Sequence, residues 1–260
     1  VLPYLVMGGF TMPISEKIIN NIPEYISSIT DLRSTHDKLW FRGHPNVEYF
    51  LQPTVYRSPY SWKNERSLLH QFKARAARFI DNPPTTNIEW LFIMQHHATP
   101  TRLLDWSENA LIALAFATQY RSDQHKGKDA AVWCLNPRKL NENIRFSDFL
   151  DEPIPNICDN TELQTMFESP RQDYPVAIIG PQNTDRIIAQ RGVFTLFPNK
   201  DSFSLESVEH ADEFLFKIII PESSIKTISD DLYYMGMTES TIFPELDSIS
   251  KELRKNYEGR

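Results

Sequence analysis

The chain has little cysteine, no long apolar run and no excess of positive charge. Its 260 residues contain only Cys134 and Cys158, which fit neither a metal-ligand spacing nor a disulfide framework, so we expect reduced thiols. No stretch approaches the roughly 18 apolar residues that cross a bilayer. The net charge of −7 argues against a general affinity for nucleic-acid backbone, although local basic patches are compatible with it. We therefore expect a cytoplasmic protein with no membrane partner.

The sequence also lacks the glycine-rich loops of the common nucleotide-binding folds. Neither GxGxxG nor GxxxxGK[ST] occurs, so Rossmann-type and Walker-type binding lose their usual support. No histidine or cysteine set has convincing metal-ligand spacing, and we expect no metal. The opening VLPYLVMGGFTM is apolar but short and has no basic flank, so we do not expect a secretion signal there. The sequence leaves open whether residues 1–11, ahead of Met12, are native.

Apolar periodicity predicts mostly helices in the first half and mostly strands afterwards. We expect helices at about 14–30, 62–80, 86–97, 106–120, 222–234 and 239–256. We expect strands at KLWFRG, AAVWCL, PVAIIG, GVFTLF and EFLFKIII. This order predicts an α+β fold in one domain, with a helix-rich N-terminal half packed on a mixed or antiparallel sheet. The polar region 136–173 is expected to be a long excursion.

One stretch, QHHATPTRLLDWSENALIALAFA, puts titratable groups directly before an apolar helix. Because that helix is apolar on every side, we expect it to be buried on every side. Asp105 and Glu108 have the spacing of an N-terminal capping pair. Arg102 beside a buried helix start needs a partner, which is either Asp105 or an anionic ligand. The pattern predicts a pocket whose floor is the buried helix.

A second polar cluster contains Arg42, which follows an apolar strand and precedes Gly43. An arginine fork suits phosphate or carboxylate, although an ordinary ion pair is the alternative. Glu65 lies on the apolar face of its helix, so it is paired with a cation such as Arg42 or Arg102, or it is catalytic, or it interacts with the helix dipole. His96 ends a helix, where contact with free carbonyls is the alternative to a functional role.

Four blocks carry a resemblance to a known family. FRGHPNVEYFLQPTVYR, QHHATPTRLLDWSENALIALAFA, AQRGVFTLFP and STIFPELDSISKEL occur in this order between about residues 38 and 255. Together they resemble the FRG domain, named for the triplet that stands here as Phe41-Arg42-Gly43. The resemblance implies an FRG domain over residues 38–260, with residues 1–37 as an N-terminal segment and helix packed on it. The family is described mainly by its sequence, so the resemblance implies no established chemistry.

LWFRG and TPTRLLDWSENALIALAFA are also, more distantly, similar to ADP-ribosyltransferases of the Arg-Ser-Glu type. This second resemblance implies an ADP-ribosyltransferase-like core with NAD as a substrate and no separate cofactor. The third block of that superfamily is a catalytic glutamate at the start of a late strand, where this chain has Gln190. Glutamine carries no charge to stabilise a ribosyl cation. Either Glu65 or Glu245 therefore substitutes, or the fold has become a binding module.

The second resemblance also implies roles for individual residues. Arg42 and Arg102 would hold phosphates, His96 or Thr101 would orient the ribose or nicotinamide, and Glu65 would stabilise positive charge. The candidate catalytic residues are thus Arg42, Glu65 and His96, and the candidate nucleotide-binding residues are Arg42, Gln95, Thr101, Arg102, Asp105 and Gln190. We expect Arg42, Glu65, His96, Thr101 and Arg102 to line one pocket.

The favoured function is an NAD-consuming ADP-ribosyltransferase or NAD glycohydrolase. The alternatives are a non-catalytic nucleotide- or nucleic-acid-sensing module, and a nuclease or phosphoesterase. The expected partners are a nucleotide such as NAD and, for a transferase, a protein or nucleic-acid acceptor. A role in bacterial stress or phage defence would suit an NAD-consuming enzyme by association.

Overall fold

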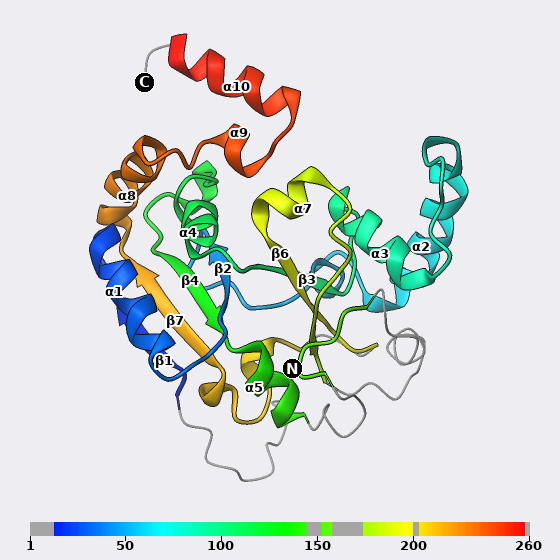
Figure 1. The fold of residues 1–260 in the computed structure, drawn as a ribbon, viewed down its shortest axis with the longest axis horizontal. Coiled ribbons are helices and arrows are strands. Elements are labelled where there is room, and N and C mark those ends of the chain that lie inside the picture. Colours follow the sequence, from blue (N-terminus) through cyan, green and yellow to red (C-terminus); the bar gives the residue numbers. More distant parts are fainter. Residues whose placement is uncertain (1–12, 145–151, 158–173, 200–202, 258–260) are drawn as a thin grey trace.

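A computed structural model describes residues 13–144, 152–157, 174–199 and 203–257 (Figure 1). Residues 1–11, Cys158 and much of the stretch 136–173 lie outside these ranges, so the expectations stated for them are not addressed by the structure. Among the described residues, no helix has the length and apolar character that crossing a membrane requires.

The described residues form one mixed sheet of seven strands in the order β1-β7-β4-β2-β3-β6-β5 (Figure 1). Only the pair β1 and β7 is parallel, and the other neighbours are antiparallel. The strands are β1 (Ser15–Ile18), β2 (Trp40–His44), β3 (Leu103–Ser107), β4 (Ala130–Leu135), β5 (Val176–Ile178), β6 (Gly192–Leu196) and β7 (Leu215–Ile220). The predicted α+β class with a mixed sheet is confirmed.

The helices are α1 (Ile22–Arg33), α2 (Trp62–Ala76), α3 (Asn87–His96), α4 (Ala110–Thr118), α5 (Pro137–Asn143), α7 (Asp185–Gln190), α8 (Glu222–Tyr234), α9 (Glu239–Ile242) and α10 (Leu246–Tyr257). Short 3-10 turns are η1 (Thr54–Tyr56), η2 (Ala77–Phe79), η3 (Asp123–His125), η5 (Leu205–Ser207) and η6 (Ala211–Glu213). Most helices begin at a polar cap: Thr86 and Glu89 form a capping box at α3, and Asn109 caps α4.

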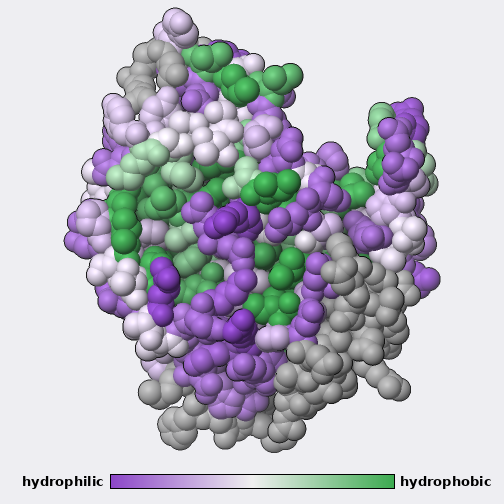
Figure 2. Space-filling view, in the orientation of Figure 1, coloured by the Kyte–Doolittle hydropathy of each residue, from purple (hydrophilic) through white to green (hydrophobic). Residues whose placement is uncertain are grey.

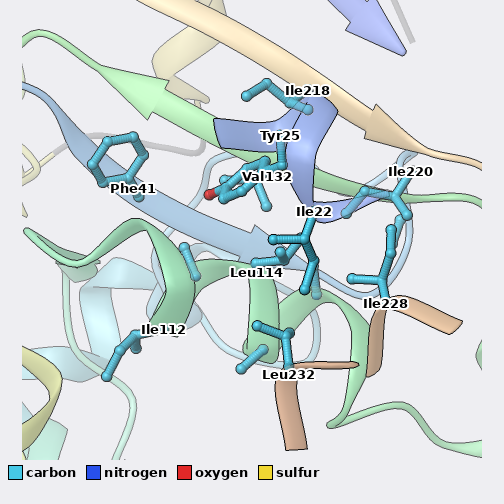
Figure 3. Close-up of a cluster of buried hydrophobic side chains, with 14 of the residues drawn as sticks. Ile22, Tyr25, Phe41, Ile112, Leu114, Val132, Ile218, Ile220, Ile228 and Leu232 are labelled. Atoms are coloured by element: carbon cyan, nitrogen blue, oxygen red, sulfur yellow. The ribbon is translucent and has the colours of Figure 1, made fainter. Parts of the chain in front are cut away.

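The core beside β2 is built around α4. Side chains of α1, β2, α4, β4, β7 and α8 meet there, as Figure 3 shows for Tyr25, Phe41, Leu114, Val132 and Leu232. Along α4, Ile112 to Ala115, Ala117 and Thr118 are buried, and Leu111 and Phe116 are partly buried. The expectation of a largely buried helix is therefore confirmed, because the helix lies between the sheet and α8.

Three predicted elements need correction. The segment 14–30 is not one helix: residues 15–18 pair with β7, and α1 starts only after Asn21, whose side chain accepts the N–H of Glu24. The segment 106–120 is also divided, because residues 103–107 form β3. Since Asn109 caps α4, Asp105 and Glu108 are not its capping pair. The last predicted helix is interrupted at Pro244, between α9 and α10.

Candidate functional site

The sheet is least regular where β2 and β3 meet. β2 pairs with β4 at all five of its residues, but with β3 only at Phe41 and Ser107. A cavity of about 250 Å³ lies at this junction, with walls from β2, β3 and β6 of the sheet and from α3, α4 and α7. The candidate site thus lies where the strand ladder is incomplete.

Gly43 explains how α4 forms part of this wall. A Cβ on Gly43 would lie 2.0 Å from the carbonyl oxygen of Ala113 and 2.7 Å from the backbone nitrogen of Ala117. Only glycine therefore lets the α4 backbone lie this close to β2. Phe41, two residues earlier, is buried beneath α4. Two members of the Phe-Arg-Gly triplet thus seat the helix, and Ile112, Ala113 and Phe116 of that helix line the cavity.

Arg42, the third member of the triplet, lines the cavity and spans the gap between the strands. Its Nη1 donates to the backbone carbonyl of Asp105 at 2.7 Å, and lies 3.9 Å from the Asp105 carboxylate. That carbonyl points toward β2, because the bonds from β3 to β6 fall on alternate residues, at Arg102 and Glu108. The Arg42 guanidinium thus donates the hydrogen bond that a backbone N–H of β2 would donate in a complete strand ladder. Burial lowers the pKa of Arg42 to about 10, with Asp105 opposing, so the side chain is cationic at neutral pH.

His44 supports Arg42 from the same face of β2. Its Nε2 accepts the Nε–H of Arg42 at 3.1 Å, which leaves Nδ1 to donate to the carbonyl of Tyr49 at 3.2 Å. Burial lowers the pKa of His44 well below its ordinary value, and the charges of Arg42 and Arg57 lower it further. His44 is therefore neutral at neutral pH, in one tautomer fixed by its two partners.

A second chain of hydrogen bonds holds Asp105. Gln95 Nε2 donates to Asp105 Oδ2 at 2.6 Å, and Gln95 Oε1 accepts the Thr101 hydroxyl at 2.5 Å. The Thr101 oxygen also accepts the N–H of Leu103 at 3.1 Å. The carboxylate fixes the orientation of the Gln95 amide, because the opposite orientation would put two oxygens together. Gln95 and Asp105 line the cavity, whereas Thr101 is fully buried outside the wall and holds the Gln95 amide in place.

The opposite wall comes from α7 and depends on the segment after α8. The Arg186 guanidinium lies 4.7 Å from the ring centroid of Phe243, a cation–π arrangement. Gln190 Nε2 donates to the carbonyl of Ile242 at 3.1 Å. Within the described part of the chain, Arg186 has no carboxylate within ion-pairing distance. The sequence reasoning missed Arg186, since nothing local distinguishes it from an ordinary surface cation.

His96 lies at the cavity beside this cation. Burial lowers the pKa of His96, and the neighbouring His97 and Arg186 lower it further, while Glu245 opposes them. His96 is therefore neutral at neutral pH and offers one donor and one acceptor. Glu245, a suggested replacement for the third-block glutamate, is exposed and is not part of the cavity wall.

Glu65 and Arg102 form a buried pair outside the cavity wall. Glu65 Oε1 accepts the backbone N–H of Arg102 at 2.7 Å, and Oε2 lies 3.2 Å from Arg102 Nε. Burial raises the pKa of Glu65, and the charge of Arg102 opposes this shift. Of the five residues expected to line one pocket, Arg42 and His96 do so, whereas Glu65, Thr101 and Arg102 do not. The carboxylate in the wall is instead Asp105.

Comparison with protein families matches residues 37–126 to the FRG domain. The chain contains an FRG domain. The matched range runs from the residues before β2 to the 3-10 turn after α4, so it includes the triplet, Gln95 and Asp105. It is shorter than the resemblance expected over 38–255, and the α7 side of the FRG cavity lies beyond it. No curated protein and no solved structure matches the chain.

The described residues contain no group of three or more His, Cys, Asp or Glu side chains placed to hold a metal ion. The FRG cavity instead combines aromatic walls, from Phe92, Trp106, Phe116 and Phe194, with the cations Arg42 and Arg186. This arrangement suits an organic anion with a flat ring.

Proposed function

We propose that the FRG cavity binds a nucleotide, and that NAD is its substrate. The observation that carries this proposal is the set of polar groups in the cavity wall that have no hydrogen-bond or ion-pair partner within the described residues. These are the Arg186 guanidinium, the His96 ring nitrogens, Asp105 Oδ1 and Gln190 Oε1. By contrast, two of the three nitrogens of the Arg42 guanidinium already have partners: Nε donates to His44 and Nη1 donates to the Asp105 carbonyl.

These atoms fit the groups of a ribonucleotide. The cation Arg186 suits a phosphate, to which a guanidinium can donate two parallel hydrogen bonds. Asp105 Oδ1 and Gln190 Oε1 are acceptors for ribose hydroxyls, a role that carboxylates have in dinucleotide sites. Phe116 and Trp106 supply apolar surface for a base or nicotinamide ring. The volume of about 250 Å³ is small for a whole dinucleotide, so one nucleoside half would enter and the other would remain outside.

The chemistry supported best is cleavage of the nicotinamide–ribose bond. The C1′–nitrogen bond breaks, its electron pair leaves with neutral nicotinamide, and positive charge develops on the ribose. A water or acceptor oxygen then bonds to C1′ and releases its proton. The Asp105 carboxylate would stabilise the developing cation, because Gln95 and Arg42 hold it in place. The sequence likeness to ADP-ribosyltransferases supports this choice of reaction. The proposed mechanism uses Asp105 and gives Glu65 no catalytic role.

One observation favours a second candidate, a nucleotide-sensing module without catalysis. Gln190 lies in the wall with its Nε2 committed to the Ile242 carbonyl, and a glutamine there supplies no charge. If Asp105 serves only to bind ribose, the same cavity holds the nucleotide intact.

Calorimetric binding of NAD and a chromatographic assay for free nicotinamide test both candidates. Arg186→Gln should weaken NAD binding about tenfold or more, the scale for a lost charge-assisted hydrogen bond. Asp105→Asn should leave binding within a few-fold and lower nicotinamide release by about 10²–10³. Arg138→Gln is a matched control, because Arg138 is on α5, outside the cavity wall, and pairs with Asp37.

The possible results separate the two candidates. Binding without release in the unaltered protein would reject cleavage and support the sensing module. Failure to bind NAD or any other ribonucleotide would reject both. Equal loss of binding in Arg186→Gln and Arg138→Gln would remove the assignment of Arg186 to the phosphate.

A further inference from the structure

The charges of this acidic chain are unevenly distributed. Residues 62–80 contain five Lys and Arg residues and a single acid, Glu65, so the segment carries +4. With a total of −7, the rest of the chain carries −11. Since Glu65 is buried against Arg102, no acid of the segment reaches its surface. We call Lys63, Arg66, Lys73, Arg75 and Arg78 the cationic face.

Four of these cations lie on α2, and Arg78 follows in η2. Glu65 and Leu69 mark the buried side of α2. Lys63 lies opposite that side, Arg66 and Arg75 lie on its two flanks, and Lys73, four residues after Leu69, lies at its edge. All are exposed except Lys73, which is half-buried over the Trp90 ring. The α2 helix projects from the body of the protein, and hydrophilic residues cover much of the projection at the upper right (Figures 1 and 2).

The cationic face is not neutralised within the described part of the chain. None of its five members has a carboxylate within ion-pairing distance there. Arg75 contacts the neutral Gln71 and Lys73 contacts the neutral Asn87. Some exposed cations elsewhere do pair, as Lys226 does with Asp230 and Lys255 with Glu239, but neither of these two is part of such a group of five within nineteen residues. A polyanion is therefore the partner that the charge pattern favours.

An exposed aromatic residue at the end of the cationic face narrows the kind of polyanion. Phe79 is 73% exposed, and the Arg78 guanidinium lies 4.6 Å from the centroid of its ring. Bases stack on such rings and on guanidinium planes, and arginine forks bind phosphate oxygens. An acidic protein would use the charges but would have no specific use for the ring.

We infer that the cationic face and Phe79 bind single-stranded nucleic acid. The strand crosses the solvent side of α2, where its phosphates contact Lys63, Arg66, Arg75 and Arg78, and one base stacks on Phe79. The face from residue 63 to residue 78 is about 22 Å long at 1.5 Å per residue, room for several nucleotides. The excess negative charge of the remaining chain repels the strand and confines it to this surface. The inference does not rest on the proposed nucleotide site.

Fluorescence anisotropy with a labelled, unstructured oligonucleotide over a range of salt concentrations tests the inference. For single strands, the slope of log affinity against log salt changes by about 0.7 for each phosphate contact. The triple variant Arg66→Gln, Arg75→Gln and Arg78→Gln should therefore make the slope shallower by about 2. A control with the same charge change is Lys226→Gln, Arg254→Gln and Lys255→Gln, which should keep the slope of the unaltered protein. Circular dichroism melts check that both variants fold.

Phe79→Ala separates stacking from charge alone. It should weaken binding about fivefold or more with little change in the salt slope, because it removes one stacking contact and no charge. No binding at low salt, or the same loss in both triple variants, would overturn the inference. So would an unchanged affinity in Phe79→Ala together with equally tight binding of poly-glutamate. Binding to anionic vesicles but not to the oligonucleotide would assign the cationic face to a membrane surface instead.

Discussion

Replacing Glu65 by glutamine distinguishes a structural from a catalytic carboxylate. Glu65 on α2 accepts the backbone N–H of Arg102, the residue before β3, and its carboxylate lies 3.2 Å from the Arg102 Nε. The two side chains are 8% and 3% exposed, so water screens this pair poorly. Glutamine keeps an acceptor for the N–H but removes the charge that faces the guanidinium.

The expected loss of stability follows from this geometry. Two unit charges 3.2 Å apart attract by about 5 kcal/mol at an effective dielectric constant of about 20. Glutamine itself costs less to bury than a carboxylate, which offsets part of this loss. We therefore expect Glu65→Gln to lower the free energy of unfolding by about 3–5 kcal/mol, the range for removing one partner of a buried pair. The double variant Glu65→Leu, Arg102→Met should lose less, because no charge stays buried.

Urea unfolding followed by circular dichroism measures these losses, and nicotinamide release per folded molecule is measured on the same variants. Since Glu65 is not part of the cavity wall, release and NAD affinity should stay close to those of the unaltered protein. A loss of less than about 1 kcal/mol in Glu65→Gln, together with a fall in release of about 10² or more, would refute this reasoning. Glu65 would then be the catalytic carboxylate.

Two further predictions concern β2. Gly43→Ala should destabilise the fold by about 1–3 kcal/mol or more in thermal unfolding, since the added Cβ meets the α4 backbone, whereas Gly127→Ala in an open turn is strained only by its positive φ. Burial, together with the charges of Arg42 and Arg57, lowers the pKa of His44. As the pH falls through about 6.5, His44 therefore takes up a proton in the unfolded state but stays neutral in the folded state. Stability should therefore fall as pH drops from about 7 to 5, by up to about 1.4 kcal/mol per pH unit, and His44→Gln should make the curve of melting temperature against pH flatter.

Much of the fold follows from local sequence, and the exceptions have physical causes. The strand AAVWCL and the helix 222–234 were predicted within the observed bounds, because each combines a strong apolar pattern with clear ends. The strand LLDWS was missed because it runs into the apolar helix with no change in hydrophobicity. The boundary between strand and helix lies at the polar residues Ser107, Glu108 and Asn109. Ser107 Oγ accepts the N–H of Asn109, and Asn109 then caps α4. Because the helix was expected to begin at residue 106, Asp105 was interpreted as its N-terminal cap.

The candidate site was harder to predict, because the role of an arginine depends on what lies beside it in three dimensions. Arg102 looked like a phosphate ligand from its place before an apolar segment, but its charge is met by Glu65 from a helix earlier in the chain. Arg186 had no distinguishing neighbour in sequence, yet Phe243 from the segment after α8 orients its guanidinium at the cavity. An arginine whose charge is paired with a carboxylate inside the protein, such as Arg102, stabilises the fold. An oriented arginine without such a carboxylate, such as Arg186, is available to bind a ligand. We therefore expect the α7 wall, which lies beyond the part of the chain that matches the FRG domain, to determine which anion the proposed site would accept.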